Sequence, residues 1–482
     1  MTIHADIWVP SLDRFDGPKY RAIADALSAD IRDGVLKQGD KLPPQRELAW
    51  QLKVTVGTVT RAYQEAERRG LVGGEVGRGT FVRPPRDHSV GSQGTSMPTD
   101  WYTLDPPDEE EDPSAPISMQ FNFPPGDVGT EDLRRAMMTL SQDPRLGQLL
   151  WYQPPTGNRQ HLQAAEAWLN KRGLSAPPDT VVISSGAHNG ILATLAAICR
   201  SGGRVATERL VYPGLRAIAR LLGLDLVPID MDGEGITPES LRQVLATGGI
   251  DAVYTVPTLQ NPTNVTQSEE RRDALAAVFR EFDVPVIEDD LFGMLPEDAP
   301  TPLTARLPEL GYYVTSLSKS IAPGLRVGFI RGPQRSREQI AAGVRGSTWM
   351  ASPLTTEIAS RWILDGTGER ILAERRRIDE ARREIAQGIL GGLDFDMPPG
   401  SLHAWLHLPD PWHASQFVNH AREEGVTLSA AHAFSIGRER PPFAVRVCLG
   451  PPRTEARMEE GLRILRHILD EHDPHQDPSA MM

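Results

Sequence analysis

The chain has 482 residues, of which 39% are hydrophobic and 24% charged, as in an ordinary globular protein. This length exceeds a single hydrophobic core, so two or three domains are expected. The apolar runs, such as residues 190–199, are shorter than the about 20 residues that span a bilayer. The first ten residues have neither a basic start nor an apolar signal core, and two cysteines exclude a disulfide framework. We therefore expect a cytoplasmic protein without membrane contact.

The charges are unevenly distributed along the chain. The net charge of −13 argues at first against a nucleic-acid partner. Residues 41–86, however, hold nine Lys and Arg against four Glu, a balance of +5, so the rest of the chain carries −18. A small basic module on an acidic body is typical of a DNA-binding protein. Charge alone favours a solvated basic face, so the motifs must decide.

Two short helices separated by a tight turn are expected near the N-terminus. Apolar residues at helical spacing predict a first helix over residues 19–34. Two consecutive prolines then break the chain before a short helix that starts near Gln45, and a further helix spans about residues 56–69. Residues 71–83 predict two short strands around a glycine-rich tip.

In a helix-turn-helix, the second helix places its N-terminal residues against base edges in the major groove of DNA. Threonine hydroxyls there donate to bases or phosphates, and a guanidinium one turn further forks onto a guanine edge or holds a phosphate. Glycines at a wing tip allow close approach of the backbone to DNA. The candidate DNA-binding residues are Arg46, Thr55, Thr58, Thr60, Arg61, Arg78 and Gly79.

Residues 18–83 include the segments LPPQRELAWQLKVTVGTVTRAY and GRGTFV. This region resembles the winged helix-turn-helix of the GntR superfamily, with helix, turn, helix and wing in the same order. The resemblance implies that residues 1–83 form a DNA-binding domain that binds double-stranded operator DNA as a dimer. A helical domain that binds protein is an alternative that fits the basic helix and wing less well.

Residues 84–116 separate this domain from the rest of the chain. They contain seven prolines and an acidic run at residues 108–112, with few apolar residues. Such a segment buries too little surface to offset the entropy of ordering it. We therefore expect a flexible linker, with a coil span of roughly 30 Å.

Residues 117–482 alternate between helical stretches and short apolar runs. Strands are predicted at residues 180–185, 251–256, 284–289, 311–316 and 326–332. Continuous apolar runs between helices predict a mostly parallel sheet that is covered on both faces. In such α/β folds, ligands bind in the loops after the carboxyl ends of the strands.

One of these loops contains a lysine in a distinctive setting. Lys319 follows a strand in YVTSLSKSIAPGLRVGF, between Ser316 and Ser318, with Arg326 seven positions later. A buried lysine loses its proton easily and forms a Schiff base with an aldehyde. The serines and the arginine can bind a phosphate on the same ligand. The segment resembles the motif of fold-type I aminotransferases whose lysine binds pyridoxal 5′-phosphate (PLP).

The resemblance extends over about residues 117–470 and implies further cofactor contacts. Asp289 in VIEDDLFG would keep the pyridine nitrogen protonated, which makes the ring an electron sink. Asn261 in TVPTLQNPTN would contact the ring hydroxyl, and Tyr212 in ERLVYPGLR would stack on the ring. SSGAHNGI would hold the phosphate at a helix N-terminus through Gly186, Ala187 and His188, although His188 alone fits simple packing equally well.

Two further segments imply contacts beyond the cofactor. Tyr152 in WYQPPTGN would reach the phosphate bound by the neighbouring subunit, which implies a homodimer. Arg446 lies in the strand PFAVRVCLG, where the family binds the substrate carboxylate. An arginine flanked by Val445 and Val447 is costly unless it is paired. No metal ligand is expected.

The sequence departs from the family at two places. The tyrosine that usually follows the nitrogen-binding aspartate and donates to the ring oxygen is absent, because Leu291 and Phe292 occupy that region. Asn264 stands where the N-P-x-G-type loop usually has glycine. The first departure removes a hydrogen bond that tunes the imine, so efficient transamination is in doubt.

A GntR-type winged helix joined through a linker to this domain is the architecture of the MocR (GabR-like) regulators. The resemblance implies a PLP-dependent transcription regulator that senses an amino acid or amine through an external aldimine, which displaces Lys319. Such a ligand biases DNA binding only if it favours one of two conformations. The alternative is a working aminotransferase with a secondary DNA-binding domain.

Overall fold

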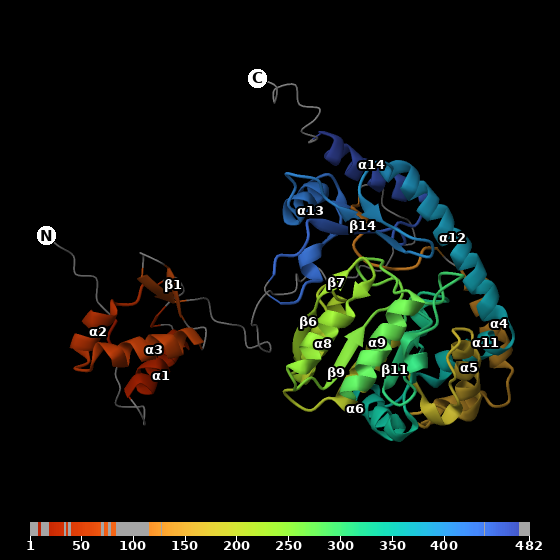
Figure 1. Cartoon of the computed structure of the whole chain (residues 1–482), viewed down its shortest axis with the longest axis horizontal. Helices are drawn as coiled ribbons and strands as arrows, with labels where there is room; N and C mark the ends of the chain where they lie inside the picture. Colours follow the sequence, from red (N-terminus) through yellow and green to blue (C-terminus); the bar gives the residue numbers. More distant parts are fainter. Residues whose placement is uncertain are drawn as a thin grey trace. The chain divides into compact units, whose positions relative to one another are not determined.

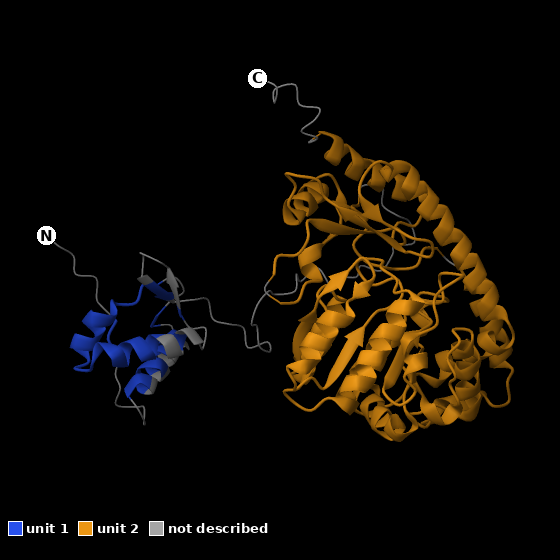
Figure 2. Ribbon diagram, viewed as in Figure 1, with its two compact units in different colours: residues 1–104 blue, residues 105–482 orange. Residues whose placement is uncertain are grey.

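The computed structural model describes residues 8–10, 19–32, 35–36, 40–68, 72–75, 79–82, 115–126, 128–437 and 439–471 (Figure 1). The chain divides into two compact units, residues 1–104 and residues 105–482 (Figure 2). None of the helices within the described ranges is both long and apolar enough to cross a membrane.

The first unit contains three helices and a two-stranded hairpin. The helices are α1 (Lys19–Arg32), α2 (Gln45–Gln51) and α3 (Val56–Arg68), and β1 (Val72–Glu75) pairs antiparallel with β2 (Gly79–Val82). Ile23 and Leu27 of α1 pack against Leu48 of α2 and Val59 of α3 in one small core. The predicted helices and strands of the winged helix-turn-helix are therefore confirmed, with boundaries within one or two residues.

The second unit is built around a seven-stranded sheet. Its strands, in spatial order, are β4 (Val181–Ser184), β12 (Gly328–Arg331), β11 (Gly311–Ser316), β10 (Val286–Asp289), β9 (Ala252–Thr255), β5 (Arg204–Glu208) and β6 (Asp225–Ile229). All neighbours are parallel except β12, which runs antiparallel to β11 and to β4. The carboxyl ends of β4, β9, β10 and β11 therefore meet at one edge of the sheet.

Helices cover both faces of this sheet. Side chains of successive residues point to opposite faces, so Val182 packs into one core and Val181 and Ile183 into another. One face is covered by α6 (Ala187–Ile198), α7 (Pro213–Leu222) and α10 (Arg337–Thr348). The other face is covered by α5 (Arg159–Asn170), α8 (Pro238–Ala246), α9 (Glu269–Phe282) and α11 (Pro353–Leu364). The predicted mostly parallel, doubly covered sheet is confirmed.

A smaller C-terminal subdomain completes the second unit. Its antiparallel sheet has the order β13 (Phe395–Asp396), β14 (His403–His407), β17 (Ala444–Cys448) and β16 (Ser429–Ala430). The helices α13 (Ala414–Glu423) and α14 (Glu455–Glu471) pack on it, and β15 (Val426–Thr427) pairs with β3 (Ile117–Ser118). The long helix α12 (Thr367–Leu390) runs along the side of the unit to α14 (Figure 1). The unit also contains α4 (Thr130–Ser141), the strand pair β7 (Met231–Asp232) and β8 (Gly235–Ile236), and several short 3-10 helices.

Candidate functional site: a pyridoxal phosphate pocket

Lys319 follows strand β11 in a tight turn and points toward the C-terminal subdomain. Its ammonium group donates a hydrogen bond to the backbone carbonyl of Asn122 and lies 5.8 Å from the centre of the Phe123 ring. Burial lowers the pKa of Lys319 to about 8, and the charge of Arg446 acts in the same direction. A lysine with this pKa is partly neutral near pH 7, as attack on an aldehyde requires.

An anion-binding corner lies beside Lys319. Helix α6 begins at Ala187, so its first backbone N–H groups have no partner within the helix. Gly186 precedes it with φ of +86°, and a Cβ there would lie 2.7 Å from the guanidinium of Arg326. Arg326 donates to the carbonyl of Ser185 over 3.2 Å. A helix N-terminus, a close guanidinium and the absence of side-chain bulk suit a phosphate.

Two of the predicted phosphate ligands are held together at the end of β11. The hydroxyls of Ser316 and Ser318 are 3.0 Å apart, and the Ser316 hydroxyl accepts from the backbone N–H of Ser318 over 3.2 Å. On the other side of the corner, the rings of His188 and Tyr212 meet edge to face, with centroids 6.3 Å apart. The structure thus orders these predicted side chains in two pairs.

Asp289 ends strand β10 and has one oxygen that lacks a partner. Tyr254 of the neighbouring strand β9 donates to Oδ2 over 2.6 Å, whereas the buried Oδ1 has no hydrogen bond. Burial raises the pKa of Asp289 to about 7, although the bond from Tyr254 acts in the opposite direction. A buried acceptor without a donor is costly. The N–H of a protonated pyridine ring would supply that donor, so the residues present fit PLP.

Arg446 and Asn261 are brought together from segments far apart in the sequence. Arg446, which is 3% exposed, donates from Nη1 to Oδ1 of Asn261 and from Nη2 to the carbonyl of Gln120, each over 2.8 Å. Its guanidinium lies 4.7 Å from the centre of the Phe434 ring. These contacts fix the orientation of the guanidinium and pair it with neutral acceptors only, which suits recognition of a carboxylate.

Asn264 stands where the family usually has glycine, and it adopts a backbone conformation that is typical of glycine. Its φ is +62°, in the left-handed region that asparagine tolerates better than most residues. Its amide donates to the carbonyl of His403 over 2.7 Å and to that of Asp396 over 3.0 Å. The substitution therefore adds two bonds between this loop and the C-terminal subdomain.

The other departure removes a hydroxyl from the site. Phe292 is 4% exposed and packs in the core of the large sheet with Leu317 and Phe329. A phenylalanine ring has no group to donate to the oxygen of a bound cofactor. The tyrosine that the structure does place nearby, Tyr254, bonds Asp289 instead.

Three polar residues of the site carry no motif that the sequence analysis could use. Tyr254 lies inside an apolar strand, and His403 begins another strand that is otherwise buried. Asn122 lies in an irregular segment after β3. Their connection to the site is revealed only by distant partners: Asp289 for the Tyr254 hydroxyl, Pro262 for the His403 ring and Lys319 for the backbone carbonyl of Asn122.

The predicted DNA-binding residues differ in how free their side chains are. Arg46 and Arg61 are exposed on α2 and α3, and the hydroxyl of Thr55 accepts from the N–H of Thr58 over 3.3 Å. The hydroxyl of Thr60 donates to Gln45 over 2.7 Å and so ties α3 to α2. Gly79 starts β2, whereas Arg78 lies outside the described residues.

The site and fold define a class of protein: a winged helix-turn-helix domain joined to an aminotransferase-like domain that binds PLP. Residues 19–82 match the bacterial regulatory proteins of the gntR family, and residues 115–465 match aminotransferase class I and II. The second match covers well over half of the chain. The chain therefore belongs to the aminotransferase class I and II family, and its N-terminal domain gives it the MocR-type architecture.

Relatives with both domains are transcription regulators by name. The HTH-type transcriptional regulator YdeF of Bacillus subtilis (strain 168) is 31% identical over 464 residues, which are 96% of this chain and 97% of the relative. The vitamin B6 salvage pathway transcriptional repressor PtsJ of Salmonella typhimurium is 27% identical, over 90% of this chain and 95% of the relative. The chain is accordingly a DNA-binding transcription regulator, and that part of the predicted function is confirmed.

Solved structures support the fold of the second unit. An archaeal alanine:glyoxylate aminotransferase has a TM-score of 0.68 at 23% identity, over 74% of this chain and 91% of that one. The kynurenine aminotransferase of Pyrococcus horikoshii has the same TM-score and identity, over 92% of its length. The predicted fold class and the PLP cofactor are confirmed. Across the described ranges, no group of three or more His, Cys, Asp or Glu is placed to hold a metal ion.

Proposed function

We propose that the second unit is a sensor of an amino acid or amine, and that its occupancy changes the affinity of the first unit for operator DNA. The observation that carries this proposal is a complete set of cofactor and carboxylate ligands beside a buried Phe292. The site can hold a ligand but lacks the hydroxyl that would tune it for turnover. A sensor needs binding rather than fast release of product.

Each residue of the site has a distinct role in this proposal. PLP, when bound, supplies an aldehyde that joins covalently to amines. Lys319 would be the catalytic group, since it would hold the cofactor and give it up to the amine of the effector. Asp289 would keep the ring nitrogen protonated, with Asn261 toward the ring oxygen and Tyr212 against the ring. The phosphate would be held by Gly186, Ala187, His188, Ser316, Ser318 and Arg326.

Arg446 sets the chemical class of the effector. Its guanidinium is buried and fixed by Asn261 and Gln120, so it favours a ligand that carries a carboxylate. The relative PtsJ is named for the vitamin B6 salvage pathway, and another relative, PdxR of Corynebacterium glutamicum, is named for pyridoxine biosynthesis. A B6 compound is therefore the alternative effector. The two possibilities differ in whether PLP alone changes DNA binding.

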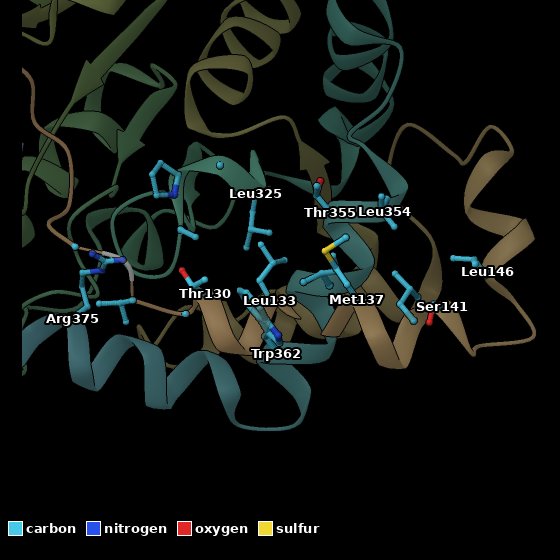
Figure 3. Close-up of a pocket in the computed structure, with 18 residues that line it drawn as sticks. Thr130, Leu133, Met137, Ser141, Leu146, Leu325, Leu354, Thr355, Trp362 and Arg375 are labelled. Carbon is cyan, nitrogen blue, oxygen red and sulfur yellow. The ribbon is translucent and has the colours of Figure 1, made fainter. Parts of the chain in front are cut away.

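We further propose that the chain acts as a homodimer in the cytoplasm. Tyr152 is 79% exposed and packs its ring against Trp349, with centroids 5.6 Å apart. An apolar cavity of about 750 Å³ in the same unit is lined by Leu133 and Met137 of α4, Leu325 and Leu354 (Figure 3). A second copy of the chain would cover this surface and carry its Tyr152 to the phosphate corner beside Leu325.

The DNA contacts follow from the exposed side chains of the first unit. Arg61 and Thr58 would read the major groove, while Arg46 would bind a phosphate. Thr60 would act mainly by ordering the two helices, because its hydroxyl donates to Gln45, whereas the hydroxyls of Thr55 and Thr58 bond each other at the exposed start of α3 and would face the DNA together. The wing residues Arg78 and Gly79 would contact the backbone of the DNA.

A working aminotransferase is the second candidate. The observation in its favour is that Lys319, Asp289 and Arg446 suffice for a slow half-reaction, with the pKa of Lys319 lowered to about 8. A steady-state assay with amino donors and keto acids separates the two. An enzyme turns over many times, whereas a sensor stops after binding or after one half-reaction.

The decisive experiment for the proposal measures cofactor absorbance and DNA affinity in the same samples. The full chain, with and without PLP, is titrated with the common amino acids against a DNA fragment that it selects from a random pool. Allosteric coupling of the usual size predicts a change in DNA affinity of about 5- to 150-fold. Robust multiple turnover with no change in DNA affinity would contradict the sensor and favour the enzyme.

A further inference from the structure

The chain enters the second unit through a short stretch, residues 117–122, which we call the joining segment. Its first two residues form β3, which pairs with β15. The N–H of Met119 donates to Thr427 over 3.0 Å, and the carbonyl of Met119 accepts from the N–H of Cys448 over 2.9 Å. The joining segment is therefore part of the C-terminal subdomain, and it is also the direct continuation of residues 84–116.

Two cationic groups of the ligand site, Arg446 and Lys319, donate to carbonyls of the joining segment. Arg446 binds the carbonyl of Gln120 over 2.8 Å, and Lys319 binds the carbonyl of Asn122. The hydroxyl of Ser429 donates to the same Gln120 carbonyl over 3.2 Å. A carboxylate on Arg446, or a covalent bond at the Lys319 nitrogen, competes with the joining segment for these donors. Charge-assisted bonds are among the stronger ones in proteins, so the competition matters.

A buried histidine fixes the far end of the joining segment. His403 Nδ1 is 3.0 Å from the amide nitrogen of Asn122, and Nε2 is 2.9 Å from the carbonyl of Pro262. Burial, with the charge of Arg446, lowers the pKa of His403 to about 3, so the ring is neutral. A carbonyl only accepts, so the single N–H lies on Nε2 and Nδ1 accepts from Asn122. This pair links the joining segment to the loop that contains Asn261.

We infer that the joining segment transmits ligand binding at Lys319 and Arg446 to the linker and so to the DNA-binding domain. Asn122 and His403 act as positioning residues in this transmission. The inference rests on the proposed sensor function and adds the element through which it acts. Ligands that take Lys319 or Arg446 shift the joining segment, and the bond from Asn122 to His403 makes that shift depend on the loop around Asn261. Without the bond, the direct links of the joining segment to the site are the bonds from Lys319 and Arg446, which the ligand itself removes, so the segment no longer follows the loop around Asn261.

Two variants and one control test this inference. Asn122→Ala removes the amide donor, and His403→Phe removes both ring bonds while keeping a ring of similar size. Tyr312→Phe is the matched control, because it deletes a partly buried bond to Ser336 elsewhere in the large domain. All are compared with the wild-type chain at saturating PLP, which absorbance verifies, after thermal unfolding shows that each is folded. The probe is the amino acid that changes the DNA affinity of the PLP-loaded wild-type chain most.

The expected result is a coupling of at least about 5-fold in the wild-type chain and in Tyr312→Phe, and less than about 2-fold in both other variants. The double variant should lose no more than either single one, because the two residues share one bond. Coupling that persists in Asn122→Ala and His403→Phe would overturn the inference while leaving the sensor function intact. If no probe changes the DNA affinity of the wild-type chain, the sensor function itself fails, and the inference with it.

Where His403→Phe does not fold, hydrogen exchange of the folded Asn122→Ala chain decides. In the wild-type chain, the probe should alter exchange in peptides covering the joining segment, whose amides at Ile117 and Met119 are hydrogen-bonded. In Asn122→Ala, that effect should be confined to peptides around Lys319. An unchanged effect over residues 117–122 would contradict the role of Asn122.

Discussion

The two ends of the PLP pocket are built in different ways. The phosphate end uses backbone N–H groups, small hydroxyls and Arg326, which lies at the surface. The ring end uses buried charged groups, each with a specific partner, such as Asp289 with Tyr254 and Arg446 with Asn261. At the phosphate end, the binding free energy is divided among several weak donors. At the ring end, it depends on single buried residues. Substitutions should therefore cost little at the first end and much at the second.

Lys319, which lies between the two ends, should show the largest effect. Lys319→Ala removes the amine that would join the cofactor covalently, so the visible absorption band should disappear completely. Borohydride should fix the cofactor on the peptide that contains Lys319 in the wild-type chain. Lys171→Ala, which removes a lysine paired with Glu369 on the surface, should keep the band. An adduct on another lysine would show that the assignment is wrong.

Asp289 should show the next largest effect, at the ring end. Asp289→Asn removes the negative charge that pairs with the ring nitrogen, a charge-assisted bond worth about 1.5–3 kcal/mol. The dissociation constant of PLP, measured by absorbance titration, should rise about 10- to 150-fold. The control Asp251→Asn, whose partners are the backbone N–H and the side chain of Arg200, should leave it unchanged. An equal loss in both variants would point to general destabilisation.

These two residues also show what the sequence could predict. Lys319 and its serines form one continuous motif, and apolar runs predict the strands before Gly186 and Asp289. The fold and the phosphate end could therefore be predicted from the sequence. Tyr254, His403 and Asn122 were not, because their partners lie 35 or more positions away. A periodicity of two places a strand residue on a face but does not identify its partner on another element.

Tyr254→Phe should have a smaller effect that depends on pH. The pKa of Asp289 is raised to about 7 by burial, so its carboxylate gains a proton, and PLP affinity falls, as the pH drops through about 7. The bond from Tyr254 holds this pKa down. Without that bond the pKa rises further, and PLP should bind about 5-fold more weakly at pH 7, a loss of about 1 kcal/mol.

Measurement of PLP affinity against pH distinguishes this role from a structural one. The deficit of Tyr254→Phe should shrink as the pH rises above the new pKa of Asp289. A deficit that is constant with pH would mean that Tyr254 only packs the strand.

Ser316→Ala should have the smallest effect, at the phosphate end. The helix N-terminus at Ala187, Ser318 and Arg326 remain, so the loss should be about 0.5 kcal/mol, or roughly 2-fold in PLP affinity. A titration with PLP, alongside Asp289→Asn, compares the two ends directly. If Ser316→Ala cost more than Asp289→Asn, the contrast between the ends would be reversed.

The central claim is that ligand binding at the PLP site and DNA binding are coupled through one conformational equilibrium of the chain. Linkage requires reciprocity: if an amino acid changes DNA affinity by some factor, the DNA must change the affinity for that amino acid by the same factor. The most direct test titrates the PLP-loaded chain with the amino acid, followed by absorbance, with and without saturating DNA. We predict equal factors within about 5- to 150-fold. Identical titration curves in the presence and absence of DNA, for an amino acid that binds the site, would contradict the claim.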